Sequence, residues 1–281
     1  MTLNPLTFER VRKLVHQRTA IVLDPGKEYL VESRLTPIAR AHGFASIDEL
    51  CRQLDRNGPL LAEVVEAMTT NETSFFRDHH PFEALRRQVL PELLQRRAKE
   101  RTLRIWCAAC STGQEPYSLA MLLDDQFPQL STWNVSIYAT DVSKAVLARA
   151  KTGRYRQIEV NRGLTAPMLV KYFRRDGLEW EIRPDLRRRV QFAEMNLIEK
   201  WPPMEKFDLI FLRNVLIYFD LETKLAILRN MHAQVANDGY LVLGGSETTP
   251  PGVNSFERVP IARAGIYKRA AKRASQSSHA R

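Results

Sequence analysis

The sequence predicts an α/β protein in which a small all-α domain precedes a mostly parallel, doubly wound sheet. Three observations lead to this prediction. Apolar residues recur at helical spacing over the first 68 positions, and from position 103 short apolar runs alternate with helical segments. The length of 281 residues also suffices for one small and one medium domain.

The composition excludes several classes of protein. An apolar content of 44% and an aromatic content of 9% permit a packed core, so the chain is not expected to be disordered. No run approaches the roughly eighteen uninterrupted apolar residues of a membrane span, and the N-terminus has no secretory signal. Three cysteines, an odd number, fit a reducing compartment. We therefore expect a cytoplasmic protein that does not insert into a membrane.

Residues 1–68 are expected to form the helical domain. Thr7 is placed to cap a helix that carries Phe8 and Val11 on its apolar face. The tetrapeptide Ser-Ile-Asp-Glu at 46–49 has the form of a capping box, and a further apolar stripe ends at Met68. After a linker at 69–80, another helix is expected at about 81–99.

Residues 81–268 are predicted to form the α/β domain. Strands are expected at 103–109, 135–140, 190–192, 207–212 and 240–243. Helices are expected at 117–123, 143–150 and 221–235. Ligands of such sheets bind beyond the carboxyl ends of the strands, so the residues that follow each strand are the first candidates for a site. The segment of about 151–190 is longer than a crossover requires, and we expect an inserted subdomain there.

The net charge of +10 is unevenly distributed along the chain. Residues 151–190 contain eleven basic and five acidic side chains, whereas residues 1–70 contain nine of each. The segment 269–281 is basic and polar, and we expect it to be a disordered tail. The charge favours acidic partners, among which nucleic acid has to be weighed.

The linker holds groups that a spacer does not need. Asn71 and Thr73 are short hydrogen-bonding residues, and Arg77 carries a fixed, fork-shaped charge. A plain spacer would be rich in Gly, Ser or Pro. The linker is therefore interpreted as half of a binding site. The alternative is a helix start, capped by one of the polar residues at 71–74, with both phenylalanines of the segment packed inward.

The first predicted strand leads into a turn that suits a nucleoside. The turn contains Gly113, a helix follows it, and Asp141 at the end of the next strand is placed to accept hydrogen bonds from ribose hydroxyls. One glycine instead of three argues against a dinucleotide pyrophosphate. Glu115 beside the helix start would repel a phosphate but could receive an ammonium group. The layout therefore indicates S-adenosylmethionine as the cofactor.

The end of the first predicted strand and the turn after it contain the pair Cys107 and Cys110 at C-x-x-C spacing. A zinc site would require a second such pair or two suitably spaced histidines, and the sequence has neither. A thioredoxin-like motif would open a helix directly, whereas Ser-Thr-Gly intervenes here. Redox chemistry is the minor alternative for this pair.

Three motifs follow one another behind the helical domain. They are TTNETSFFRD at 69–78, CSTGQEPYSLA at 110–120 and LRNVLIYF at 212–219. Together they resemble the chemotaxis receptor methyltransferases, the CheR family, over about residues 5–268. The resemblance implies the Rossmann-like fold of class I S-adenosylmethionine-dependent methyltransferases. It also implies a protein-glutamate O-methyltransferase that forms γ-methyl esters on the cytoplasmic helices of chemoreceptors, for adaptation in chemotaxis-type signalling.

The resemblance also implies the residues of the site. Cofactor contacts are expected from Asn71, Thr73, Arg77, Glu115, Asp141, Asn196, Leu197, Arg213 and Asn214. Tyr218 matches the tyrosine that the family places beside the transferred methyl, and Tyr218 and Arg77 are the catalytic candidates. The alternative for Tyr218 is a core aromatic residue at the end of an apolar run. No metal is expected, because the sulfonium is already an electrophile and a carboxylate, with a pKa of about 4.3, is already a nucleophile.

The expected partner is the acidic helical bundle of a methyl-accepting chemoreceptor, which suits the basic insert. Relatives that dock on a receptor's C-terminal pentapeptide tether carry a longer, glycine-rich loop where this chain has 173–180 with one glycine. Tether binding is therefore doubtful. We expect a monomer that does not bind DNA.

Two other hypotheses stay open on the sequence. A nucleic-acid methyltransferase would call for aromatic stacking platforms and a catalytic Cys or an Asn-Pro-Pro-Tyr-like motif after the fourth strand, where Arg213–Tyr218 stands instead. A non-catalytic scaffold that binds S-adenosylmethionine is disfavoured by the intact polar site residues.

Overall fold

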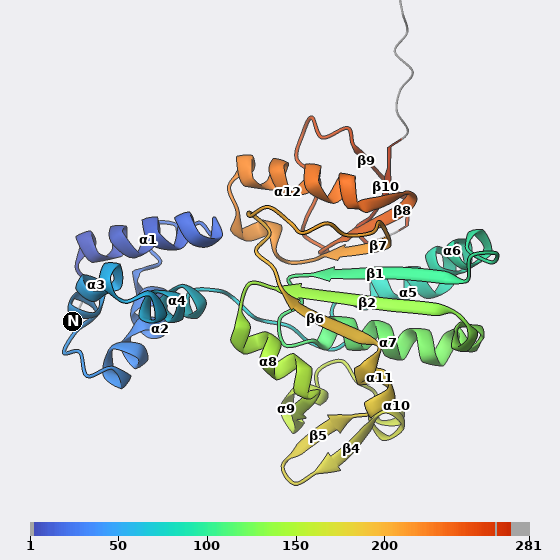
Figure 1. The fold of residues 1–281 in the computed structure, drawn as a ribbon, viewed down its shortest axis with the longest axis horizontal. Coiled ribbons are helices and arrows are strands. Elements are labelled where there is room, and N and C mark those ends of the chain that lie inside the picture. The colour runs from blue at the N-terminus through green and yellow to red at the C-terminus, as the bar shows by residue number, and fades with distance from the viewer. Residues whose placement is uncertain (1–2, 262, 271–281) are drawn as a thin grey trace, which may run out of the picture.

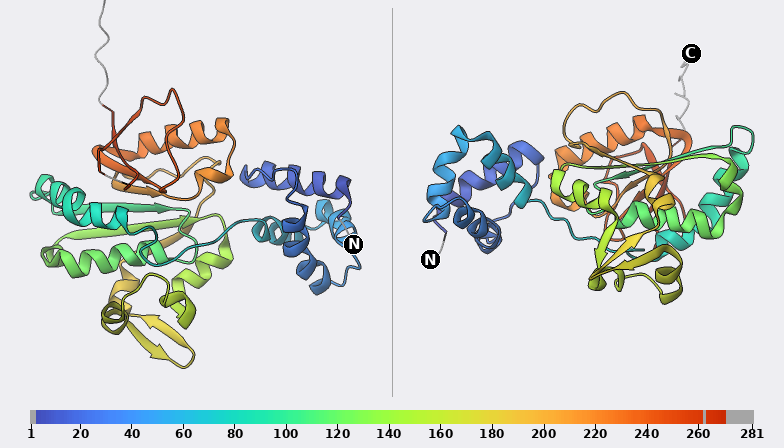
Figure 2. Two further views of the ribbon diagram at one scale, coloured as in Figure 1. Left: turned by 180° about the vertical axis from the view of Figure 1, so that it is seen from behind. Right: turned by 60° about the horizontal axis from the view of Figure 1, so that its bottom comes forward.

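The structure is a computed structural model that describes residues 3–261 and 263–270. It consists of a helical domain, an extended linker and an α/β domain (Figure 1). Figure 2 shows from two further directions that the helical domain stands beside the α/β domain, at the end of the linker.

The helical domain packs its helices around one apolar core. Its helices are α1 (Pro5–Thr19), α2 (Glu28–Ala41), α3 (Ile47–Gln53), the 3-10 turn η1 (Leu54–Arg56) and α4 (Gly58–Ala67). The buried residues recur at helical spacing along each of them and include Val11, Val15, Val31, Leu35, Leu50, Leu60 and Val64. The domain core is therefore formed by the apolar stripes that the sequence displays.

The two expected helix caps have different outcomes. The hydroxyl of Ser46 accepts a hydrogen bond from the backbone N–H of Glu49 at 3.1 Å, as the capping box predicts. The prediction for Thr7 is wrong, because Asn4 caps α1 by accepting from the N–H of Leu6 at 2.9 Å. The Thr7 hydroxyl donates instead to the carboxylate of Asp48 in α3. It therefore links two helices.

The α/β domain contains a seven-stranded sheet in the order β6-β2-β1-β7-β8-β10-β9. The strands are β1 (Thr102–Ala108), β2 (Asn134–Asp141), β6 (Val190–Glu194), β7 (Phe207–Leu212), β8 (Val235–Leu243), β9 (Phe256–Arg258) and β10 (Ile266–Arg269). The first five pair in parallel and the last two are antiparallel. This confirms the predicted class and adds two short strands at one edge that the sequence did not indicate.

Helices cover both faces of this sheet, which is why its strands are apolar on both sides. One face carries α5 (His80–Ala84), the π-helical turn η2 (Leu85–Val89), α6 (Leu90–Arg96), α7 (Gln114–Gln126) and α8 (Lys144–Thr152), and the other carries α12 (Leu221–Gln234). Within β1, Ile105 packs with the first group and Trp106 with the second. Short 3-10 turns lie at η3 (Pro128–Thr132) and η4 (Leu216–Tyr218).

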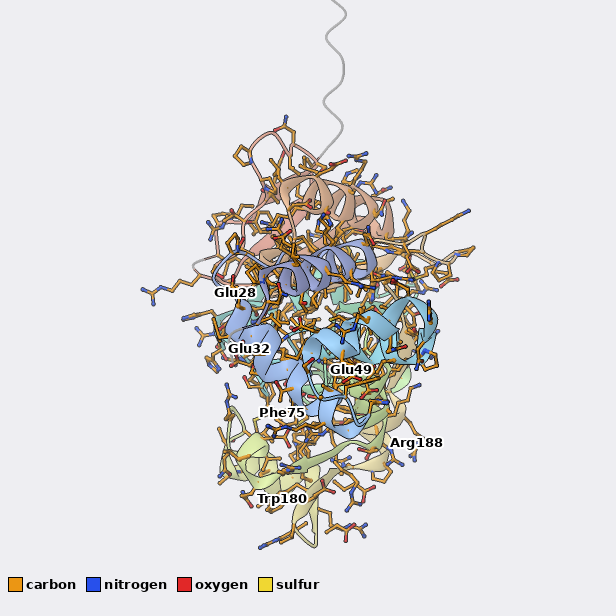
Figure 3. All side chains as sticks on the ribbon, turned by 90° about the vertical axis from the view of Figure 1, so that its left-hand side faces the viewer. Glu28, Glu32, Glu49, Phe75, Trp180 and Arg188 are labelled. Atoms are coloured by element: carbon orange, nitrogen blue, oxygen red, sulfur yellow. The ribbon has the colours of Figure 1, made fainter. Side chains whose placement is uncertain are left out.

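Between α8 and β6 the chain forms a separate antiparallel sheet in the order β3-β5-β4. This insert contains β3 (Arg154–Arg156), α9 (Gln157–Val160), α10 (Ala166–Tyr172), β4 (Phe173–Asp176), β5 (Glu179–Ile182) and α11 (Pro184–Arg188). Figure 3 labels Phe75 of the linker above Trp180 of the β4–β5 hairpin. The Phe75 ring meets those of Tyr155 and Phe173 edge to face, with centroids 5.0 and 5.5 Å away. The insert thus packs against the linker through an aromatic cluster.

The end of the chain differs from the expectation at one point. Arg269, the first residue of the expected tail, still belongs to β10 and pairs with Phe256. Residues 271–281, which make up nearly all of that tail, lie outside the described residues. Among the helices that are described, none has the length and apolar character needed to cross a membrane.

Replacement by alanine should lower the free energy of unfolding by different amounts at two glycines of the insert. Gly163 has φ +101°, and a Cβ there would lie 1.8 Å from the carbonyl oxygen of Phe75. At Gly177, with φ +61°, no atom of the described residues other than those of the glycine and its chain neighbours lies within 4 Å of the Cβ position. Gly177→Ala should therefore cost about 1 kcal/mol for its left-handed backbone alone. Gly163→Ala should cost about 3 kcal/mol, because the linker must also move. Urea unfolding of both variants measures this difference, and equal losses would contradict the contact.

Candidate functional site

All ten residues singled out from the sequence line one cavity. They are Asn71, Thr73, Arg77, Glu115, Asp141, Asn196, Leu197, Arg213, Asn214 and Tyr218. The cavity lies beyond the carboxyl ends of β1, β2, β6 and β7, as the rule for parallel sheets predicts. Thr19 and Ile21 of the helical domain also line it. Three parts of the chain that are distant in sequence therefore enclose one space.

The turn after β1 is held in an uncommon backbone conformation. Ala109 and Ser111 have φ of 58° and 50°, and Gly113 has 92°. The N–H of Ser111 donates to Asp141 Oδ2 at 2.8 Å, and its hydroxyl donates to the carbonyl of Asn71 at 2.8 Å. Left-handed backbone at non-glycine residues is costly and persists where the surroundings enforce it, as these two bonds do. The turn is thereby joined to both the next strand and the linker.

Arg213 connects the linker to the sheet. Its side chain is only 1% exposed, and one terminal nitrogen donates to Glu115 Oε2 at 2.8 Å. The other donates to Asp78 Oδ2 at 2.9 Å and to the carbonyl of Arg77 at 2.8 Å. A planar guanidinium can satisfy such divergent acceptors, whereas an ammonium cannot. The Nε atom of Arg213 is buried and has no hydrogen-bond partner in the described protein.

Two carboxyl groups of the cavity have raised pKa values, which favour their neutral forms. Burial raises the pKa of Glu115 above its usual range, and the charge and hydrogen bond of Arg213 offset this only in part. Burial likewise raises the pKa of Asp141, against the opposing hydrogen bonds from the N–H groups of Ser143 and Ser111. A ligand that brings a cation or hydrogen-bond donors would favour the ionised forms. Raised pKa values in a cavity are typical of functional sites.

Residues 70–79 contain no helix, and α5 begins only at His80, so the helix-start alternative is wrong for this segment. Arg77 Nη1 donates to the carbonyl of Glu72 at 2.8 Å, and Asn71 Nδ2 donates to Thr69 Oγ1 at 3.0 Å. These local bonds shape the linker around the cavity. The packing part of that alternative holds, because Phe75 is fully buried and Phe76, partly buried, packs against the same core.

The helical domain reaches the cavity at two places. Asn196 Nδ2 donates to the carbonyl of Arg18 at 2.9 Å, at the end of β6. The N–H of Val22 donates to the carbonyl of Tyr218 at 2.8 Å, and Ile21 forms an antiparallel bridge with Phe219. Tyr218 is half-buried and lines the cavity, which differs from the core alternative. No sequence pattern pointed to Thr19–Val22, because this contact joins segments about two hundred residues apart.

The profile of the CheR methyltransferase SAM-binding domain matches residues 71–265, and that of the CheR methyltransferase all-alpha domain matches residues 6–69. The chain belongs to the CheR methyltransferase family. The family expected from the three motifs is thereby confirmed, and the enzyme is a methyltransferase with an S-adenosylmethionine-binding domain.

Several chemotaxis proteins are similar to this CheR-family chain over most of its length. Chemotaxis protein methyltransferase 1 of Pseudomonas aeruginosa is 42% identical, with 93% of this chain and 97% of that protein covered. Chemotaxis protein methyltransferase Cher2 of Pseudomonas putida is 39% identical, with 95% and 99% covered. The chemotaxis protein methyltransferase of Salmonella typhimurium is 36% identical, with 91% and 88% covered. These relatives support methylation in chemotaxis.

The environment of the thiols predicts that the cysteines of this CheR-family chain are inert. Cys107 and Cys110 are buried and free, and burial raises the pKa of both thiols well above the ordinary value. Burial also raises the pKa of Cys51 to about 11. Because the thiolate is the reactive form, Ellman's reagent at pH 8 should label the native protein slowly and the denatured protein at all three thiols. Rapid labelling of Cys107 or Cys110 in native protein would revive the redox alternative.

Proposed function

We propose that this enzyme is a protein-glutamate O-methyltransferase that forms γ-methyl esters on the cytoplasmic helices of chemoreceptors. The observation that supports the proposal most is the single cavity that joins two buried carboxyl groups, Glu115 and Asp141, with Arg77 and Tyr218. The motif resemblance supports the same substrate. The proposal places the enzyme in the cytoplasm as a monomer.

The residues of the cavity fit S-adenosylmethionine. Glu115 offers a largely buried carboxylate, 13% exposed, to the ammonium of the methionyl group, and its raised pKa would be relieved by that cation. Asp141 still has acceptor capacity for ribose hydroxyls besides its two backbone donors. Asn196 and Leu197 offer an amide and an apolar surface to the adenine, and Asn71, Thr73, Arg213 and Asn214 complete the enclosure.

The acceptor chemistry requires positioning more than proton transfer. When bound, S-adenosylmethionine supplies a methyl group already activated by its sulfonium, so an ionised glutamate needs no general base. Water stabilises two separate opposite charges more than a transition state in which they cancel. The enclosure by linker, sheet and helical domain would therefore contribute by excluding water and aligning the acceptor. We assign Arg77 to a charge-assisted hydrogen bond with a carboxylate, and Tyr218 to the orientation of the reacting groups.

The insert remains the expected contact with the acidic receptor bundle. Much of its positive charge is neutralised internally, because Arg154 pairs with Asp176 and Glu179. Arg175 and Arg188 form no ion pair within the part of the chain that the structure describes, and Figure 3 shows Arg188 at the insert. The β4–β5 hairpin has a short turn at Gly177, so docking of a receptor tether peptide is not part of the proposal.

The proposal is tested by tritiated methyl transfer from S-adenosylmethionine to receptor-containing membranes, followed by treatment with alkali. A γ-methyl ester is hydrolysed by base, so the label should be released as methanol. Alkali-stable label on protein, or label on RNA in a parallel reaction, would contradict the proposal and favour a different methyltransferase.

Replacement of Tyr218 by Phe should lower turnover and leave cofactor affinity nearly unchanged. The substitution removes only the hydroxyl of a residue that lines the cavity, whereas the ring and backbone that help to enclose it are retained. Loss of one orienting hydrogen bond should reduce kcat by about 10- to 100-fold. Steady-state kinetics and calorimetry with adenosylhomocysteine measure the two effects, and an unchanged kcat would remove Tyr218 from the mechanism.

Affinity for adenosylhomocysteine should fall as the pH falls. The protonated amino group of this ligand needs ionised Glu115. Burial raises the pKa of Glu115, so acidification protonates this carboxyl while the amino group of the ligand keeps its charge. Below the raised pKa, the association constant should fall by up to about tenfold per pH unit for each proton taken up. Glu115→Gln should bind weakly and with a flatter pH profile, which would then reflect Asp141. An unaltered profile in Glu115→Gln would exclude Glu115 as the partner of the ammonium.

A further inference from the structure

A buried carboxylate follows the last parallel strand, where candidates for a site were expected, but the sequence assigned it no role. Glu247 follows β8, is 5% exposed, and does not line the cavity. Its Oε2 atom accepts from the backbone N–H of Asn214 at 2.6 Å and of Gly244 at 2.7 Å. Its Oε1 atom accepts from the N–H of Val215 at 3.0 Å and of Ile217 at 3.3 Å. One side chain thus satisfies four backbone donors.

Three of these donors belong to the loop that connects β7 to Tyr218. Asn214 in this loop has φ +57°, a left-handed conformation that a residue other than glycine adopts at a cost. The carboxylate of Glu247, which is not among the residues that line the cavity, offsets that cost with charge-assisted hydrogen bonds. Without it, the N–H groups of Asn214, Val215 and Ile217 would lose their acceptor. The loop conformation therefore depends on a residue about thirty positions further along the chain.

The space around the carboxylate fits this role. A Cβ at Gly244 would lie 2.7 Å from Glu247 Oε2 and 2.8 Å from Asn214 Nδ2. Glycine at 244 therefore allows the carboxylate and the loop to approach the end of β8. On the other side, the N–H of Val22 holds the carbonyl of Tyr218 at 2.8 Å. The backbone before and at Tyr218 is fixed from two directions, by Glu247 and by the helical domain.

We propose that Glu247 is a positioning residue for methyl transfer, which holds the 214–217 loop in the conformation that directs Tyr218 into the cavity. The inference rests on the proposed function, because it assigns the loop a part in that reaction. Burial of a carboxylate is unfavourable unless it is hydrogen-bonded, and the four hydrogen bonds that Glu247 accepts within the described residues all come from main-chain N–H groups. These bonds therefore favour one defined backbone conformation.

Glu247→Gln is the direct test, because it retains the shape of the side chain. Whichever way the amide is oriented, one oxygen becomes an NH2 group that faces two backbone donors, so two of the four bonds are lost. We expect kcat to fall about 100-fold, since displacements near 1 Å in a reacting site have effects of that size. The affinity for adenosylhomocysteine, measured by calorimetry, should change far less. Glu257→Gln, at an exposed position in β9, is the matched control and should leave kcat unchanged.

A double-mutant cycle with Tyr218→Phe distinguishes positioning from a general loss of stability. If Glu247 acts through the loop, the hydroxyl of Tyr218 contributes little once the loop is released. The double variant should then be scarcely slower than Glu247→Gln alone. If the losses of kcat in the two single variants multiply in the double variant, the inference is overturned and the proposed function stands.

Two further outcomes are equally decisive. Glu247→Gln could lower the midpoint of thermal unfolding while the molecules that still bind adenosylhomocysteine keep a normal kcat. That result would show that Glu247 is only structural and would overturn the inference. A neutral Tyr218→Phe would remove Tyr218 from the proposed function, and the inference with it. An inactive wild-type enzyme on receptor membranes would instead refute the proposed function itself.

Discussion

The hydrogen-bond network of Arg213 is the interaction on which the site depends. One buried guanidinium joins the strand end of β7, the start of α7 through Glu115, and the linker through Asp78 and the carbonyl of Arg77. Burial of a charge costs several kcal/mol unless it is paired and hydrogen-bonded, and here two carboxylates meet that requirement. Because the network spans three segments, the linker cannot leave the sheet edge without uncovering a charge. The cavity therefore exists as a defined shape and not as a gap between mobile parts.

The linker is held from its other sides by contacts of different kinds. Phe75 lies in the aromatic cluster of the insert, and the hydroxyl of Tyr155 from the same cluster donates to the carbonyl of Thr112 at 2.8 Å. The insert thus supports both the linker and the turn after β1. At the start of the linker, Arg34 of α2 donates to the carbonyls of Met68 and Thr69 at 2.8 and 2.9 Å. Glu66 of α4 accepts from the N–H of Ala145 at 2.9 Å, at the start of α8.

The sequence predicted the parts of this arrangement that local patterns encode. The five parallel strands and the helices between them appear as apolar runs, and the polar linker stands out from an ordinary spacer by residues such as Asn71 and Arg77. The family resemblance carried by the three motifs then indicated ten site residues, of which Asp141, Asn196 and Leu197 lie outside those motifs, and the structure places all ten around one cavity. Local patterns sufficed because each motif is short and contiguous.

The rest could not be predicted, because it depends on contacts between distant segments. The bridge of Ile21 with Phe219 and the bonds of Glu247 to the 214–217 loop have no periodic pattern. The expected cap at Thr7 failed for a related reason: Asn4 supplies an equivalent oxygen three positions earlier, and tertiary contact with Asp48 takes the Thr7 hydroxyl. The short strands β9 and β10 form because they pair at the edge of the sheet. Their own sequences are too short to indicate a strand.

Hydrogen–deuterium exchange with and without adenosylhomocysteine tests the central claim most directly. If linker, sheet edge and helical domain enclose one ligand, the ligand should slow exchange in 70–78, in 109–115 and in 19–22 together, although these segments are far apart in sequence. The remote β9–β10 edge serves as the internal reference and should exchange at the same rate in both states. Protection confined to 109–115, with the linker and 19–22 unaffected, would contradict the account, because the ligand would then contact the sheet alone.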